Sequence, residues 1–535
     1  MLFNSFIFIF AFLPVCLCGF YALSRHASRA AWGWIVLCSL FFYSYWDIRF
    51  LPVIAVSIIA NYAVAQGLFS TPERPRLQTS LLAVGVAGNI AALCYYKYLF
   101  AIFGFLRASA HLDVPFAQVA LPLGISFFTF TQIGYLVDVK QGTARHRNLL
   151  DYALFVTFFP HLIAGPILHH AEMMPQFADR ANQRFNAENF AVGVTIFLIG
   201  LVKKVVIADM LSDRVALGFG GAGHIGTLAA WMAAITFTFQ LYFDFSGYSD
   251  MAIGLARMFN VRFPMNFNSP FKAASIIDYW QRWHMTLTRF VNMYLFTPVS
   301  LALTRRWLSR HPGTLKAATS RPGSFLILVA FPLLLTMGVL GIWHGAGFQY
   351  LIFGLLNGAY LVVNHAARNL LPKRGAQQRP AVVEAALHAG KVLLTCLCVL
   401  MAQIFFRSAS VGQALDMLAG LVGLHAGGAP GPVQEIGLSK RFWAEIALLY
   451  GIVWAAPNTQ QIMEMFNPVL GRFQRSEQRA SVRFVESLGG DRLAGRLVRA
   501  TTWRPGLGTA FAALIVFAFC LTRMTGISPF LYFQF

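Results

Sequence analysis

The chain has 535 residues, of which 57% are hydrophobic and only 12% are charged, and its mean hydropathy is +0.60. These proportions exclude an ordinary soluble enzyme, and apolar runs of about 20 residues, long enough to cross a bilayer, recur along the chain. The bases behind the formal charge of +21 fall in short connections between these runs. This positive-inside pattern indicates contact with membrane lipid and no nucleic-acid partner.

The first part of the chain is predicted to cross the membrane repeatedly. The predicted spans are Leu2–Leu23, expected to be retained as a span, Ala31–Trp46, Leu51–Phe69, Thr79–Phe103 and Leu121–Val139. Basic connections such as Glu73–Arg76 and Arg145–Arg147 are expected on the cytoplasmic side.

Two prolines interrupt the next apolar stretch, Phe158–Pro166. Because each proline removes a backbone donor, we predict a broken or re-entrant segment, which is tolerated only where protein lines a cavity. His161, His169 and His170 lie close together in the sequence. The adjacent pair points to different sides of any helix, so we predict no metal site and keep metal binding as the minor alternative.

The middle of the chain combines apolar runs with polar motifs. Ala191–Ala208 and Leu228–Phe243 are predicted spans, and the second runs into Phe243–Asp250, which holds two acids and three hydroxyls. Such groups are costly after an apolar run unless they form a network or are wet. We expect Tyr248 and Asp250 to be structural supports near a cavity, with direct chemistry as the alternative.

Ser275–Val291 is predicted to form one helix of mixed composition. Its apolar positions include Trp280 and Trp283, and its polar positions include Arg282 and His284. A helix with several tryptophans suits the plane of the membrane interface or the floor of a cavity. His284 is therefore a candidate site residue, and the alternative is a histidine that pairs locally.

A second histidine lies between two long apolar runs. Phe325–Leu340 and Phe348–Val363 flank the segment Gly341–Gly347, and both outer flanks are basic. If both flanks are cytoplasmic, the runs form a hairpin with His344 near its tip, toward the far side of the bilayer. A titratable side chain at that depth is a functional candidate, whereas the alternative is a packing histidine bonded to a neighbour.

The last part of the chain is predicted to add the spans Val392–Phe405, Phe442–Ala455 and Thr509–Thr522, for about 12 crossings in all. Residues 472–504 hold eight arginines against three acids. We expect them to form a cytoplasmic surface helix on anionic lipid. The predicted fold is an all-α, polytopic integral membrane protein in which residues 1–535 form a single domain.

Several motifs together resemble one known family. Trp280-Gln281-Arg282-Trp283-His284 and, sixty residues on, Trp343-His344-Gly345-Ala346 with Phe353–Gly358 after it resemble the paired-histidine signature of the membrane-bound O-acyltransferase (MBOAT) family. The family's polysaccharide branch, typified by alginate O-acetyltransferase, is similar at further motifs: Ile163–Pro166, Phe243–Asp250, Asn266–Phe271 and Pro529–Phe535.

The resemblance implies an O-acetyltransferase of the bacterial inner membrane, with a helical bundle around a central tunnel or funnel and a catalytic core over about residues 120–366. It would move acetyl from a cytoplasmic donor, acetyl-CoA, toward an exported polysaccharide, and it would hold no permanently bound cofactor. The partners implied are membrane lipid, the acyl donor, a periplasmic or membrane-anchored SGNH-type acetyltransferase and a polysaccharide synthase complex.

The resemblance also implies roles for individual residues. His344 would be the general base that takes the proton of an acceptor hydroxyl, and apolar burial favours the neutral imidazole that this role requires. His284 would orient donor or acceptor, or help to stabilise the oxyanion. Other residues are expected to line the tunnel or contact substrate, with no metal: Trp343, Arg282, Trp283, Trp280, Asp250, Tyr248 and Asn268.

Two positions depart from the branch pattern. The segment after the first histidine reads Val291-Asn292-Met293-Tyr294 where the branch usually has Arg-Asp-Tyr, and His161 stands where it usually has glutamine. Cellulose or another exopolysaccharide is therefore as reasonable an acceptor as alginate. The alternative functions are an MBOAT enzyme with a different acceptor, such as D-alanyl transfer to teichoic acid or acylation of a lipid or protein, and a polytopic transporter in which His344 relays protons.

Overall fold

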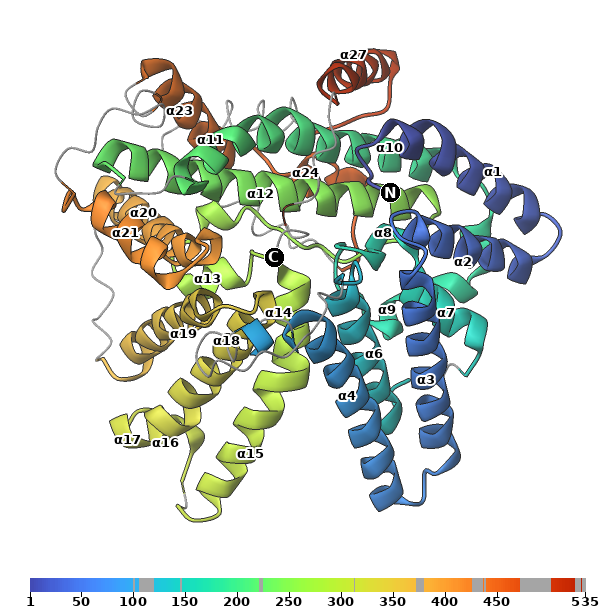
Figure 1. Ribbon diagram of the computed structural model, residues 1–535, viewed down its shortest axis with the longest axis horizontal. Coiled ribbons are helices and arrows are strands. Elements are labelled where there is room, and N and C mark those ends of the chain that lie inside the picture. Colours follow the sequence, from blue (N-terminus) through green and yellow to red (C-terminus); the bar gives the residue numbers. More distant parts are fainter. Residues whose placement is uncertain are drawn as a thin grey trace.

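The computed structural model describes residues 1–99, 102–104, 120–144, 147–220, 225–311, 313–371, 380–425, 436, 439–471, 502–524 and 531. Within these ranges the regular structure is helical and no β-strand occurs, which confirms the predicted all-α fold. The helices form two groups below a pair of long helices in the view of Figure 1. One group contains α3, α4 and α6, and the other contains α15, α18 and α19; the long pair is α10 and α12.

The helices have the following bounds. In the first half they are α1 (Leu13–Ser24), α2 (Ser28–Ser44), α3 (Phe50–Ser70), α4 (Pro75–Lys97), α6 (Ile125–Lys140), α7 (Leu149–Thr157), α8 (Phe159–Leu162), α9 (His170–Ala178), α10 (Ala187–Leu201), α11 (Asp209–Gly220) and α12 (Thr227–Met258). In the second half they are α13 (Ile276–Trp280), α14 (Met285–Val291), α15 (Thr297–Leu308), α16 (Leu315–Thr319), α17 (Pro322–Phe325), α18 (Phe331–His344), α19 (Phe348–Asn369), α20 (Ala381–Arg407), α21 (Val411–Leu421), α23 (Lys440–Ala455), α24 (Thr459–Ile462) and α27 (Leu507–Arg523). The π-helical segments η1 (Phe8–Phe12), η3 (Val202–Ala208), η5 (Asn292–Phe296) and η6 (Leu326–Ala330) continue neighbouring helices.

Seven helices in the described ranges are long and apolar enough to cross a membrane. They are Phe50–Ser70, Pro75–Lys97, Ala187–Gly220, Thr227–Met258, Pro322–His344, Phe348–Asn369 and Val382–Arg407. Shorter apolar helices are Phe8–Ser24, Val411–Leu421 and Leu507–Arg523. The chain is therefore a multi-pass membrane protein, and the total of about 12 crossings stays a prediction. Most of the basic segment, residues 472–501, lies outside the described residues.

Helices α10 and α12 pack closely at the centre of the fold (Figure 1). Gly200 and Gly247 face each other at their crossing, where a Cβ atom on Gly200 would come within 2.5 Å of the Gly247 carbonyl oxygen. Just beyond, the buried Lys204 ammonium lies 2.6 Å from Asp244 and 2.9 Å from Asp209. Asp244 also accepts the backbone N–H of Leu531 at 2.8 Å. Because the buried charges of Lys204 and Asp244 are paired with each other, they can lie in the apolar core between the two closely packed helices.

The polar motif Phe243–Asp250 lies inside α12, so the predicted span that ends at Phe243 is too short. Helix α12 continues to Met258 because the acids of the motif are paired across the helix interface instead of ending the helix. The Asp250 carboxylate lies 2.6 Å from the Lys203 ammonium and accepts the Thr459 hydroxyl at 2.6 Å. The motif therefore forms a buried network, as an apolar surrounding demands.

The predicted single helix Ser275–Val291 is also corrected. It is broken into α13 and α14 at His284, whose backbone is left-handed with φ of 42°. The break is stabilised by backbone hydrogen bonds to the segment Asn266–Asn268. The backbone N–H of Asn268 donates to the backbone carbonyl of Arg282, and the backbone N–H of Met285 donates to the backbone carbonyl of Asn266, both at 2.9 Å. These bonds replace those of a continuous helix.

The stretch Phe158–Pro166 is broken, as predicted. Helix α8 has four residues, and the chain from Ile163 to His169 has no regular structure although nearly all of it is buried. His161, the departure from the branch pattern, is buried with Nε2 2.9 Å from the Phe155 carbonyl oxygen. This irregular backbone is buried in protein and lines a cavity at Ile163 and Ala164, as an apolar environment requires.

Candidate functional site

His344 is the last residue of α18 and lies at the turn of a tight hairpin. Helices α18 and α19 approach so closely that a Cβ atom on Gly341 would overlap the Tyr350 carbonyl oxygen, and one on Gly354 would overlap the Met337 carbonyl oxygen. The predicted hairpin is therefore confirmed, and its glycines are needed for close helix contact. The close crossing determines where His344 lies, because the residues beyond it, Gly345 to Gly347, only connect the two helices.

Aromatic rings surround the His344 imidazole, which is only 7% exposed. The ring centroids of Trp343, Phe406 and Phe353 lie 4.7, 5.0 and 5.7 Å from that of the imidazole. These contacts exclude water from most of the ring, so a reactive group placed here is protected from competing hydrolysis.

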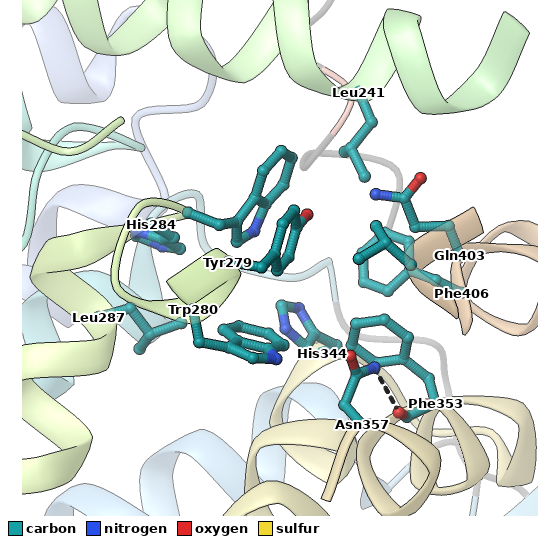
Figure 2. Close-up of a pocket in the computed structure, with 12 residues that line it drawn as sticks. Leu241, Tyr279, Trp280, His284, Leu287, His344, Phe353, Asn357, Gln403 and Phe406 are labelled. Atoms are coloured by element: carbon teal, nitrogen blue, oxygen red, sulfur yellow. Dashed lines mark hydrogen bonds between the residues drawn. The ribbon is translucent and has the colours of Figure 1, made fainter. Parts of the chain in front are cut away.

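His344 lines a cavity that we call the aromatic cavity. Its lining residues are Leu241, Tyr279, Trp280, Trp283, His284, Leu287, His344, Phe353, Asn357, Val399, Gln403 and Phe406. Figure 2 shows His344 between Trp280 and Phe353, with His284 farther away beyond Tyr279 and Trp280 in this view. The two predicted histidines thus meet around one space although sixty residues separate them.

His344 also lines a second cavity, which we call the lysine cavity. It is lined by Lys97, Leu121, Pro122, Leu123, Gly124, Ile125, Ser126, Phe127, Ile163, Ala164, Trp343 and His344. Among the described residues, His344 is the one that lines both cavities. The imidazole therefore stands in the wall between two spaces, where it can contact reactants that enter separately.

Lys97 holds the end of α18 in place. Its ammonium donates to the Trp343 carbonyl and lies 5.7 Å from the centroid of the Trp343 indole ring. The neighbouring Tyr98 hydroxyl donates to the Ile342 carbonyl at 2.7 Å. The Lys97 bond satisfies a carbonyl of the last helical turn, the Tyr98 bond adds to the Gly345 N–H on the Ile342 carbonyl, and a cation is favourable at that end of the helix dipole. Helix α4 thereby positions His344.

Hydrogen bonds determine which nitrogen of His284 carries the proton. His284 Nδ1 lies 2.9 Å from the Asn266 side-chain oxygen, and the same oxygen accepts from the Thr286 hydroxyl at 2.8 Å and from the Thr286 backbone N–H at 3.4 Å. Because a backbone N–H can only donate, the contact from Thr286 favours the oxygen at this position of Asn266, and we therefore assign His284 Nδ1 as the donor. In the neutral ring Nε2 then carries the lone pair.

His284 Nε2, which carries the lone pair, is buried. His284 is 1% exposed, and Nε2 has no hydrogen-bond partner among the described residues. Burial lowers the pKa of His284 to about 3, so the ring stays neutral at cellular pH. Its left-handed backbone is costly for a residue other than glycine, and such strain is concentrated at functional sites. A neutral ring of this tautomer accepts a hydrogen bond and cannot donate one to an oxyanion.

The other predicted site residues separate into two sets. Trp280 and Trp283 line the aromatic cavity and Trp343 lines the lysine cavity, as expected of tunnel residues. Arg282, Asp250, Tyr248 and Asn268 line neither cavity.

Each residue of the second set has a partner elsewhere. Arg282 pairs with Asp278 at 2.7 Å, Asn268 accepts from the Asn458 amide at 3.0 Å, and the Tyr248 ring stacks on Phe3 with centroids 4.7 Å apart. Their positions favour support of the fold over contact with substrate.

Sequence reasoning missed Lys97, Asn266, Asn357 and Gln403. Lys97 and Gln403 carried a usable signal, because each is a polar residue near the end of a long apolar run. Asn266 carried none on its own, since its role depends on a bond to His284 across the break between α13 and α14.

The lining of the aromatic cavity suits general-base chemistry. It offers two imidazoles and the amides of Asn357 and Gln403, and the described lining residues include no serine or cysteine. An imidazole that removes a proton from an incoming hydroxyl needs no side-chain nucleophile of the protein.

A helical membrane bundle with a buried histidine between two cavities is the architecture of a membrane-embedded acyltransferase, and the chain belongs to the MBOAT, membrane-bound O-acyltransferase family, whose model matches residues 125–310. The chain is 39% identical to the peptidoglycan O-acetyltransferase of Helicobacter pylori over 79% of this chain and 80% of that protein. It is 33% identical to the probable alginate O-acetylase AlgI of Pseudomonas aeruginosa over 100% of both chains. It is also 27% identical to the teichoic acid D-alanyltransferase of Bacillus subtilis, over 44% of this chain and 56% of that protein.

Proposed function

We propose that the protein is an O-acetyltransferase of the bacterial inner membrane, which takes acetyl from acetyl-CoA in the cytoplasm for O-acetylation of an exported glycan polymer. The observation that carries this proposal is the position of His344 in the wall between the aromatic cavity and the lysine cavity. Donor and acceptor that approach through separate cavities would meet at one imidazole.

His344 acts in this proposal as the general base. It removes the proton of the acceptor hydroxyl while that oxygen attacks the acetyl carbonyl, and the thiolate of the donor leaves. The rings of Trp343, Phe353 and Phe406 keep bulk water from the acetyl thioester, which would otherwise hydrolyse. His284 accepts a hydrogen bond through Nε2 and orients a reactant, because its tautomer does not suit oxyanion stabilisation.

The direction of the helices supports an acceptor on the outer side. Helix α4 begins beside Arg74 and Arg76, the 23-residue helix Pro322–His344 begins beside Arg321, and both run from these basic ends to the site. By the positive-inside rule the basic ends are cytoplasmic. His344 is then about 34 Å away along its helix, at 1.5 Å per residue, which is the thickness of the hydrocarbon core.

The relatives support acetyl as the group that is transferred and a cell-envelope glycan as the acceptor class. Their names include a peptidoglycan O-acetyltransferase and probable alginate O-acetylases. A partner on the periplasmic side, of the SGNH acetyltransferase type, would complete the transfer and work beside the polysaccharide synthase. The second candidate is D-alanyl transfer to teichoic acid, favoured only by relatives of 27% identity over less than half of this chain.

The test measures ester-bound acetate released by mild base from isolated envelope polymers. Cells would carry wild type, His344→Gln, His284→Ala or the control His388→Ala, which changes an exposed histidine on α20. We expect His344→Gln to lower bound acetate by about 10²- to 10⁴-fold, the usual contribution of a general base, at equal membrane level and polymer yield. His388→Ala should retain the wild-type value.

Three outcomes would contradict parts of the proposal. Retained acetate in His344→Gln removes the general base. Loss of polymer export in that variant favours the transporter alternative. Ester-bound D-alanine in place of acetate, detected in the same hydrolysate, favours the second candidate. Separate analysis of peptidoglycan and exopolysaccharide fractions identifies the acceptor.

A further inference from the structure

A cluster of metal-binding side chains lies at the end of α6 away from the two cavities. The Asp138 carboxylate oxygen Oδ2 is 2.9 Å from His169 Nε2 and 3.1 Å from His170 Nδ1. One ligand-type atom from each of the three residues lies within 4.8 Å of the others. Tyr294, on η5, donates its hydroxyl to the same Asp138 oxygen at 2.7 Å.

The two adjacent histidines converge because only one of them is helical. His169 is the N-cap of α9 and has an extended backbone, with φ of −105° and ψ of 135°, whereas His170 is the first helical residue. Their ring centroids are therefore only 4.7 Å apart. The prediction that they point apart was based on two helical positions, and it is wrong for that reason.

Burial makes the cluster unusual for a simple hydrogen-bonded group. His170 is 3% exposed, and its Nε2 has no hydrogen-bond partner among the described residues, although a polar atom buried in protein normally has one. Its Nδ1 lies 3.1 Å from Asp138 Oδ2, within the distance of an ion pair. His169 remains 22% exposed, which leaves a path from the surface.

The geometry points to a divalent transition-metal site, of the kind that binds Zn²⁺, made by Asp138, His169 and His170. Zinc bonds of about 2.0–2.1 Å in a tetrahedron place ligand atoms about 3.3 Å apart, close to the two distances from Asp138. Three protein ligands leave one position for water. Tyr294 then takes the second-shell role, because its hydroxyl orients the carboxylate that binds the ion.

The alternative is a hydrogen-bonded cluster without metal. The Ala171 amide lies 3.4 Å from His169 Nδ1, which as a hydrogen bond would place the ring proton on Nε2 and oppose metal binding there. A contact of that length is near the limit of a hydrogen bond and determines the tautomer only weakly. The alternative also leaves Nε2 of the buried His170 without a hydrogen-bond partner among the described residues.

The proposed ion would bind α6 to the start of α9 and, through the Tyr294 hydroxyl on Asp138, would also support the segment of α14 and η5. Helix α6 begins at Ile125, in the wall of the lysine cavity, and ends beside Asp138. The continuous segment of α14 and η5 begins next to His284 and contains Tyr294. An ion at the cluster would stabilise the packing of these elements without taking part in the reaction.

The experiment measures metal bound to the full-length protein in detergent, purified without a polyhistidine tag. Mass spectrometry of the metals would compare wild type with the double variant Asp138→Asn/His170→Ala and with His161→Gln, a control at a nearby buried histidine that bonds a backbone carbonyl. We expect about one ion per chain in wild type and control. In the double variant we expect the bound metal to decrease at least about tenfold, because even the loss of a second-shell partner lowers metal affinity by about that factor.

Reloading keeps the test decisive if the double variant fails to fold. Wild type stripped with a chelator should take up about one Zn²⁺ per chain and regain a higher thermal midpoint, since binding to the folded state stabilises it. Absence of stoichiometric uptake by stripped wild type overturns the proposal. Equal metal content in wild type and in a folded double variant overturns it too, because the ion is then adventitious.

Discussion

Replacing Asn266 with leucine is expected to lower acetyl transfer by about 10- to 100-fold while the protein still folds and reaches the membrane. The variant removes the oxygen that lies 2.9 Å from His284 Nδ1 and keeps a side chain of similar size. The imidazole then loses the partner that keeps its proton on Nδ1 and its lone pair on Nε2.

The magnitude follows from the bonds that are lost. A buried hydrogen bond of this kind contributes about 1–2 kcal/mol, which is a bias of about 5- to 30-fold between the two tautomers. His284 also has a left-handed backbone, so its ring is no longer held once the bond to Asn266 is removed. A displacement of about 1 Å can by itself cost about 100-fold in rate, which gives the upper limit of the expected loss.

The assay is ester-bound acetate per unit of membrane-inserted protein, with the thermal midpoint in detergent as the measure of folding. Asn266→Asp is the conservative control, because a carboxylate accepts a hydrogen bond from Nδ1–H as the aspartate of a catalytic triad does. We expect it to retain at least about a fifth of the activity. Wild-type acetate in Asn266→Leu would refute the tautomer argument, and equal losses in both variants would assign Asn266 a purely structural role.

Three further changes test other contacts. Lys97→Met should lower bound acetate about tenfold at an equal membrane level, because the end of α18 loses its cap and His344 shifts; unchanged acetate would exclude this positioning role. Gly354→Ala should destabilise the protein by about 1–3 kcal/mol in thermal unfolding, whereas Gly390→Ala, whose added Cβ meets nothing within 4 Å, should not destabilise it. Lys204→Met should cost about 3–5 kcal/mol by leaving a buried carboxylate unpaired, and adding Asp244→Asn should restore at least half of the loss; additive losses would contradict the pairing.

The sequence predicted those parts of the site that depend on local pattern. The hairpin around His344 follows from two apolar runs with basic flanks, and the broken stretch Phe158–Pro166 follows from its prolines. The paired-histidine signature assigned His284 and His344 to one site, and both residues line the aromatic cavity. In each case the information lies within a few consecutive turns of chain or within one signature.

The sequence did not predict those parts that depend on distant partners. The break at His284 exists because the segment at Asn266 binds both sides of it, and helical periodicity alone favours one continuous helix. Asp250 resembles a cavity residue in sequence but is bound by Lys203 of a neighbouring helix. Asp138 joins His169 from 31 positions away, so spacing among the histidines could not reveal the cluster.

The wall between the two cavities has a consequence for the energy supply of the cell. An acetyl group handed from one side of an energised membrane to the other needs a route, and an open aqueous route would also conduct protons and dissipate the gradient. Under the proposed function the route is closed at its narrowest point by the His344 imidazole and the rings packed around it. The reaction itself would then carry the acetyl group across, so that the membrane stays sealed during turnover.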